Sequence, residues 1–264
     1  MQILPILKFK TANVIKKPSF LLLVVGYFLL LNLIVLFNSG LLSQGGHTFN
    51  TDIKYELLTN NFALISLLYG IILAAYLGNQ FLKNDIDSRQ LYIILISFPN
   101  RVLYLSYYLI WALIVVLINI ILTNINYLLM CYAFEVKPYL VDLVVFNRDL
   151  LMNIVTVMVV SILGSLVIKK TGGVIVIVLA VILFNIYTNE FIPVINLHIG
   201  LTKIVKDIMA MIFPLKMIYL SYIDSTIKQR AIVNPFGIDI NLYQLFYMSF
   251  ILIISSRIFN QKDL

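Results

Sequence analysis

The sequence predicts an all-α, polytopic membrane protein, and three observations support this prediction. Of the 264 residues, 61% are hydrophobic and only 12% are charged, whereas a soluble domain carries roughly a quarter charged residues. The hydrophobic residues gather in runs, and a run of about 20 is long enough to cross a bilayer as a helix. The net charge of +7 is not accompanied by a basic patch interleaved with aromatic residues. It therefore indicates membrane topology and not nucleic-acid binding.

Six apolar runs qualify as transmembrane helices. None carries Asp, Glu, Lys or Arg in its interior, and they cover about 19–38, 61–82, 102–126, 150–168, 172–190 and 241–257. The first run is too long for the apolar part of a signal peptide and lacks an obvious cleavage site, so we expect it to be retained. The chain is thus expected to form one membrane domain over 19–264, preceded by a basic segment over 1–18.

The N-terminal segment 1–18 combines apolar residues with lysines at Lys8, Lys10, Lys16 and Lys17. Such a segment can lie as an amphipathic helix among the lipid headgroups, with its lysines toward phosphates or a partner. Alternatively, the lysines serve only to fix the topology. The sequence leaves both interpretations open.

The distribution of basic residues predicts that both termini are cytoplasmic. With six spans and an inner N-terminus, the short inner segments hold the N-terminal lysines together with Lys83, Arg89, Arg101, Lys169 and Lys170. The outer basic residues are spread over far longer loops, as the positive-inside rule requires. We therefore expect a multi-pass membrane protein with both termini on the cytoplasmic side.

The longest connection, about 191–240, is expected on the outer side between the fifth and sixth spans. Its apolar piece from Ile204 to Tyr222 contains charged residues and Pro214. Each charge at bilayer depth costs about 2.5 to 3.5 kcal/mol on insertion scales. We therefore expect a re-entrant helical hairpin bent at Pro214 that does not cross the bilayer.

The sequence carries no pattern typical of an enzyme or a metal site. A G-x-x-x-x-G-K-[ST] phosphate loop is missing, and His47 and His198 have no second ligand at metal spacing. We expect no metal or cofactor in this chain. The uncharged interiors of the six runs also argue against proton- or sodium-driven transport. If the protein moves a substrate, the energy must come from another subunit.

The segment KNDIDSRQLYIILISFPNR, residues 83–101, is charged and half apolar and lies between two predicted spans. From Asp85 to Ile96 it reads as a short helix, because acidic residues suit a helix N-terminus and Pro99 follows its end. A short amphipathic helix on a cytoplasmic loop fits a groove on a partner protein. The alternative is an interfacial loop shaped only by lipid headgroups.

Residues 81–108, FLKNDIDSRQLYIILISFPNRVLYLSYY, resemble the cytoplasmic loop of ABC-2-type permeases, the membrane subunits of ABC exporters. In that family an acidic residue, a small-residue turn, a leucine pair and a P-x-x-R or P-x-R ending lead into the third span. The matching positions are Asp85 or Asp87, Ser88, Leu91, Leu95, Pro99 and Arg101. The family's Gly-Thr pair is replaced near Arg89, Gln90 and Leu91, and its following lysine by Tyr107 or Tyr108. The C-terminal IFNQKDL and the hydropathy plan also resemble the family.

The resemblance implies that 83–101 is a coupling helix seated in a separate ATPase subunit, which would bind ATP and Mg. The implied contact residues are Asp85, Asp87, Ser88, Arg89, Gln90, Leu91, Tyr92, Leu95, Pro99 and Arg101. Residues 1–18 resemble the family's interfacial connector helix. The expected assembly holds two ATPase copies and a second permease copy or a homologous permease.

By analogy with compact permeases of this kind, the expected cargo is an amphipathic or antimicrobial peptide. The alternative function is a membrane scaffold or sensor that binds a cytoplasmic partner and transports nothing. ATPase binding and ATP hydrolysis in vesicles distinguish the two.

Two further patterns lie inside the predicted spans. Small residues recur every four positions in the second span, at Ser66, Gly70, Ala74 and Gly78. This spacing lets helix backbones approach closely, and we favour packing within the chain over a subunit interface. In the third span Asn119, Thr123 and Asn126 share one face. They either bond to a neighbouring helix or line a substrate route, and Asn185 and Asn189 invite the same two interpretations.

Overall fold

The computed structural model describes residues 18, 20–22, 24–30, 32–33, 51–87, 101–138, 140–168, 211, 214–215 and 239–261. Within these residues the regular structure is entirely helical, which confirms the all-α class for this part of the chain. The complete helices are α3 (Thr51–Asp87), α5 (Arg101–Ala133), α6 (Leu140–Val167) and α10 (Ile240–Gln261). Further helical residues lie between 18 and 33.

Three of the described helices are long and apolar enough to cross a membrane. They are Arg101–Ala133, Leu143–Val167 and Ile240–Gln261. Shorter apolar helical stretches cover Phe20–Leu30 and Ile65–Asn79. The predicted interfacial segment with its lysines, residues 88–100, the fifth span with Asn185 and Asn189, and most of the outer connection lie outside the described residues.

Local bonds fix two of the helix ends. At the end of α5 the amide of Val136 donates to the carbonyl of Cys131 (2.9 Å), and the amide of Glu135 donates to the carbonyl of Tyr132 (3.2 Å). Glu135 adopts a left-handed φ of 57°, so these bonds form the Schellman arrangement that terminates a helix. At the start of α10, Oδ1 of Asp239 accepts bonds from the amides of Asn241 (2.8 Å) and Leu242 (3.2 Å). Asp239 is therefore the N-cap of α10.

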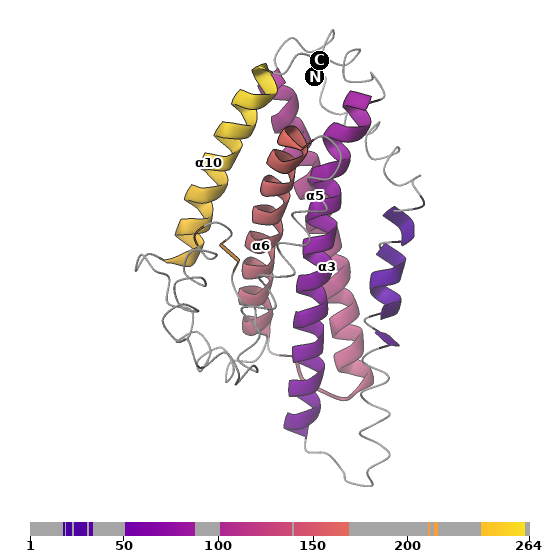
Figure 1. Ribbon diagram of the computed structural model, residues 1–264. Helices are drawn as coiled ribbons and strands as arrows, with labels where there is room; N and C mark the ends of the chain where they lie inside the picture. Colours follow the sequence, from indigo (N-terminus) through magenta and orange to yellow (C-terminus); the bar gives the residue numbers. More distant parts are fainter. Residues whose placement is uncertain are drawn as a thin grey trace, which may run out of the picture.

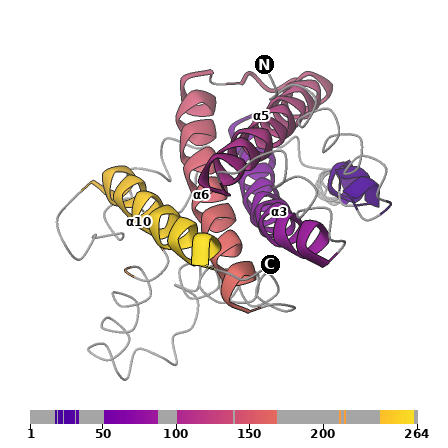
Figure 2. The same cartoon turned by 90° about the horizontal axis from the view of Figure 1, so that it is seen from above.

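Helix α6 lies between α3 and α10, and α5 packs beside α3 (Figures 1 and 2). The C-terminal ends of α3, α6 and α10 lie with the start of α5 at one end of the bundle, which we call the Arg101 end (Figure 1). The opposite end is called the Asp239 end. Helices α3, α6 and α10 thus point in one direction and α5 in the other, which is the direction that the six-span plan assigns to each.

The helices extend beyond the predicted spans. Helix α3 has 37 residues, which at 1.5 Å each is about 55 Å, far more than the hydrocarbon thickness of about 30 Å. The prediction that Asp85 and Asp87 open a separate short helix is wrong, because both lie in the last turn of α3. Helix α6 likewise begins ten residues before the predicted start at 150, at Leu140.

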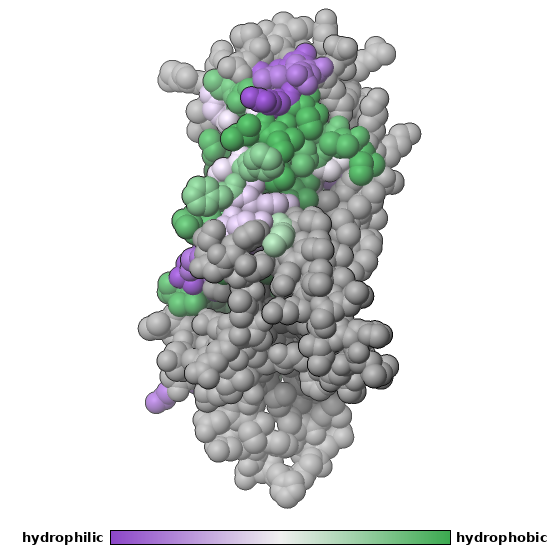
Figure 3. Space-filling view, turned by 60° about the vertical axis from the view of Figure 1, so that its left-hand side comes forward, coloured by the Kyte–Doolittle hydropathy of each residue, from purple (hydrophilic) through white to green (hydrophobic). Residues whose placement is uncertain are grey.

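The outer surface of the bundle is strongly apolar. Large aliphatic side chains of α5 are exposed over about 29 Å of helix length, at Ile110, Ile114, Leu117, Ile118, Ile121, Leu122, Ile125, Leu128 and Leu129. Figure 3 shows a hydrophobic surface over the α10 side, with a hydrophilic patch at its upper end. A surface of this kind is compatible with lipid contact and marks an interaction face in water.

Candidate functional site

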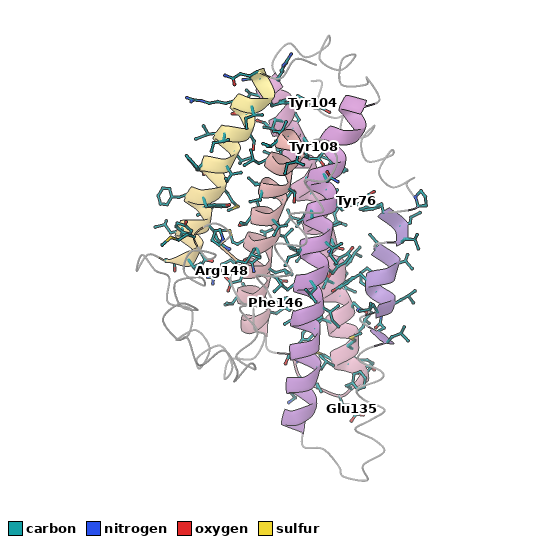
Figure 4. All side chains as sticks on the ribbon, in the orientation of Figure 1. Tyr76, Tyr104, Tyr108, Glu135, Phe146 and Arg148 are labelled. Atoms are coloured by element: carbon teal, nitrogen blue, oxygen red, sulfur yellow. The ribbon has the colours of Figure 1, made fainter. Side chains whose placement is uncertain are left out.

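The helices that flank residues 88–100 are bonded to each other. The hydroxyl of Tyr108 in α5 donates to the backbone carbonyl of Leu77 in α3. Tyr108 is buried, and its ring lies 5.5 Å from that of Trp111. Figure 4 shows Tyr104 and Tyr108 toward the Arg101 end of the bundle. A displacement of either flanking helix at this end would therefore involve the other.

Arg101 joins the start of α5 to the end of α10. Its Nη1 atom donates to the carbonyl oxygens of Phe259 (3.2 Å) and Asn260 (3.1 Å). The last carbonyls of a helix lack donors within the helix and carry partial negative charge, so a guanidinium suits them well. The ring of Tyr104 lies 6.5 Å from that of Phe259 and adds an apolar contact. The residue predicted to contact an ATPase thus binds the C-terminal helix of its own chain.

Two of the small residues at four-residue spacing, Gly70 and Gly78, lie where α3 meets α6. A Cβ atom added at Gly78 would lie 2.5 Å from Cβ of Ser161 and 2.9 Å from the carbonyl oxygen of Met158. One added at Gly70 would lie 2.6 Å from Cδ1 of Ile154. The two glycines therefore allow the helix backbones to approach closely.

The other two members of that pattern are also buried, and they have different neighbours. Ala74 is fully buried. The hydroxyl of Ser66 lies 2.9 Å from that of Tyr27, in the helical residues before α3. The rings of Tyr27 and Tyr69 stack with centroids 3.9 Å apart. This part of the pattern attaches the first apolar run to α3.

The polar face of α5 points into the bundle. Asn119 and Thr123 are buried, and the Thr123 hydroxyl donates to the Asn119 carbonyl (2.8 Å). The Nδ2 atom of Asn126 is buried and has no hydrogen-bond partner among the described residues. Asn119 and Thr123 therefore pack within the chain, while Asn126 keeps a donor that a further group could use.

A polar junction at the start of α10 was missed by the sequence reasoning. Gln244 is fully buried, and its Nε2 atom donates to Oδ1 of Asn153 in α6 (2.9 Å) and to the carbonyl of Pro214 (2.7 Å). The hydroxyl of Tyr243 donates to the carbonyl of Met211 (2.9 Å). These bonds connect α10 at the same time to α6 and to Met211 and Pro214, which precede it in the chain. The sequence did offer a signal, because Asn153 and Gln244 each place an amide side chain inside a predicted apolar run.

A buried carboxylate lies one turn before Asn153 on the same face of α6. Asp149 is only 4% exposed. Its Oδ1 atom lies 3.0 Å from both Nε and Nη2 of Arg148, whose side chain is 56% exposed. Figure 4 shows Arg148 beside the lower part of α10. A buried carboxylate is tolerated when it is paired in this way.

The described residues hold no reactive constellation. Among them, no three His, Cys, Asp or Glu side chains gather as metal ligands, and Cys131 is a buried free thiol. No protein family, curated protein or solved structure matches the chain. The hydrogen bonds of Tyr108, Arg101 and Gln244 instead connect helices to one another, so their role within the described residues is to hold the bundle together.

Proposed function

We propose that this protein is the transmembrane permease subunit of an ATP-driven ABC exporter in the bacterial cytoplasmic membrane. The observation that supports this most strongly is the bonding around residues 88–100. The flanking helices are connected through Tyr108 and Leu77, and Arg101 adds α10. A force applied to this short segment would therefore reach three helices together.

The end of α3 suits a basic partner. Asp85 and Asp87 lie in its last turn, where the helix dipole already contributes partial negative charge. Acidic residues are unfavourable at this position unless cations approach them. A basic groove on an ATPase subunit would supply these cations and orient the docking. The partner surface is thus expected to be positively charged around the end of α3.

The proposed cycle uses the stiffness of the bundle. ATP and Mg bind the two ATPase copies, whose closure pushes residues 83–101. Helices α3 and α5 move together, because the Tyr108 hydroxyl is bonded to the Leu77 carbonyl of α3. Helix α6 follows them through its close contact with α3 at Gly70 and Gly78. The movement opens a route between two permease copies for an amphipathic peptide. An amphipathic or antimicrobial peptide is proposed as the cargo by analogy with compact permeases of this kind.

The test is co-purification followed by hydrolysis in vesicles. Tagged protein from its native membrane should carry an ATP-hydrolysing subunit, and hydrolysis should rise when the complex enters vesicles with a cationic amphipathic peptide. The purified chain alone should hydrolyse nothing, since it has no phosphate loop. A chain that binds a cytoplasmic protein without nucleotide hydrolysis would be a scaffold or sensor instead.

A matched pair of variants connects the structure to this test. Tyr108→Phe removes the bond to Leu77 and keeps the ring, so ATPase binding should persist while peptide-stimulated hydrolysis and transport fall. Tyr132→Phe makes the same chemical change at an α5 residue that is 87% exposed. It should behave like the wild type. Equal behaviour of the two variants would argue against transmission through the α3–α5 contact.

A further inference from the structure

We infer that α10 carries movement from the Arg101 end to the outer connection, with Arg101 as the positioning residue that engages it. The biological role of this movement rests on the proposed function. The structural coupling that it requires is a property of the chain alone. It can therefore be measured without an ATPase.

Arg101 connects the start of α5 to the end of α10 through two hydrogen bonds. Nη1 of Arg101 donates to the Phe259 and Asn260 carbonyls, which belong to the last turn of α10. Arg101 is also the first residue of α5, directly after residues 88–100. Any displacement of the start of α5 is thus passed to the end of α10 through charge-assisted bonds, which are stronger than neutral ones.

The connection at the other end reaches the outer segment. About 15 residues, or about 22 Å, before the Arg101 contact, Gln244 donates to both Asn153 and the Pro214 carbonyl. Tyr243 adds its bond to the Met211 carbonyl. Oε1 of Gln244 is buried and accepts no hydrogen bond from the part of the chain that the structure describes, so the junction retains an acceptor for a rearranged bond.

The stretch between the two ends can move as a rigid body. Helix α10 is continuous over 22 residues. Its buried face toward the bundle consists of Met248, Ile251, Ser255 and Phe259, and no hydrogen bond from these side chains to α6 is present among the described residues. Apolar helix contacts of this kind permit small shear movements. Helix α10 would therefore tilt about Gln244 when Arg101 moves, and the tilt would act on Pro214.

The test is hydrogen exchange of the full chain in lipid nanodiscs, with Arg101→Met as the main variant. Loss of the charged bonds should speed exchange in the last turn of α10 about tenfold. If α10 is one mechanical unit, the amides of residues 240–248 and of Leu215 should also exchange faster. Arg101→Lys retains an ammonium donor and should restore protection at both ends.

The control is Arg257→Met, which removes an exposed arginine from the same end of α10 and should change neither region. Faster exchange confined to residues 257–261 would overturn the inference, because it would show simple fraying. If Arg101→Met does not accumulate, Arg101→Leu, which also lacks a hydrogen-bond donor, provides the same comparison. A failure of ATPase co-purification would refute the proposed function and leave this result unaffected.

Discussion

Replacing Gly78 by alanine should loosen the contact between α3 and α6. The new methyl group would lie 2.5 Å from Cβ of Ser161, 2.9 Å from the Met158 carbonyl oxygen and 3.1 Å from the Ile162 amide nitrogen. Favourable carbon contacts lie at about 3.5 to 4.0 Å, so the helices must separate locally by about 1 Å. Two of the three obstructing atoms belong to the backbone, which cannot rotate away as a side chain can.

The magnitude follows from a comparison with Gly26. A Cβ atom at Gly26 meets none of the described residues within 4 Å, so Gly26→Ala reports only the helix preference of alanine over glycine, about 1 kcal/mol. Gly78→Ala gains the same helix preference, but its new methyl group also overlaps with atoms of α6. Overpacking costs about 1 to 3 kcal/mol. We therefore expect Gly78→Ala to have a free energy of unfolding about 1 to 3 kcal/mol lower than that of Gly26→Ala.

The assay is reversible unfolding of the purified protein by SDS in mixed micelles, followed by circular dichroism. Gly70→Ala provides an internal check, because its methyl group would meet Cδ1 and Cγ1 of Ile154, which are side-chain atoms. Its cost should be smaller, and Ile154→Val in the same chain should relieve part of it. Equal stability of Gly78→Ala and Gly26→Ala would refute the close contact between α3 and α6.

Three further predictions concern helix ends and the single cysteine. Glu135→Gly should raise the free energy of unfolding by about 1 kcal/mol, because glycine adopts the left-handed φ of 57° without the cost that other residues incur; unchanged SDS unfolding would contradict this. Asp239→Ala should lower it by about 1 kcal/mol through loss of the N-cap, while Asp239→Asn should stay near the wild type. Cys131 is 1% exposed and should react with a maleimide only slowly until SDS unfolds the protein; rapid labelling of the folded protein would show that this part of α5 is open.

Hydropathy predicted the helical class but not where each helix ends. The hydropathy pattern predicts a span that starts at 150, directly after Arg148 and Asp149, because charged residues lower the mean hydropathy of the segment that contains them. The structure continues α6 back to Leu140, with the carboxylate buried and paired and the guanidinium directed to the surface. A hydropathy average treats both charges as unfavourable in a membrane helix. It contains no information on whether they are paired or buried, because that depends on the fold.

Tertiary bonds between distant residues were beyond the sequence reasoning. The four-residue spacing predicted a close helix approach, and Gly70 and Gly78 do lie against α6. In contrast, Gln244 and Asn153 are 91 positions apart and Arg101 and Phe259 are 158 apart. Neither pair belongs to a local pattern, and each depends on which helices become neighbours.

The most direct measurement of the central claim is ATPase binding by two sets of variants. Asp85→Ala, Asp87→Ala and Arg89→Ala, combined in one chain, remove charges from the segment that is proposed to dock the ATPase. The sequence predicts that these residues lie on an aqueous loop, where substitutions usually change stability little, so expression and assembly should be normal. ATPase co-purification and transport should fall, because the charge complementarity that orients the partner is lost.

The comparison chain carries Lys169→Ala and Lys170→Ala, which alter the other predicted inner loop. It should retain most of its ATPase binding. If the triple variant binds the ATPase undiminished and only the Lys169→Ala, Lys170→Ala chain loses it, then residues 83–101 are not the docking segment. That result would contradict the account at its centre.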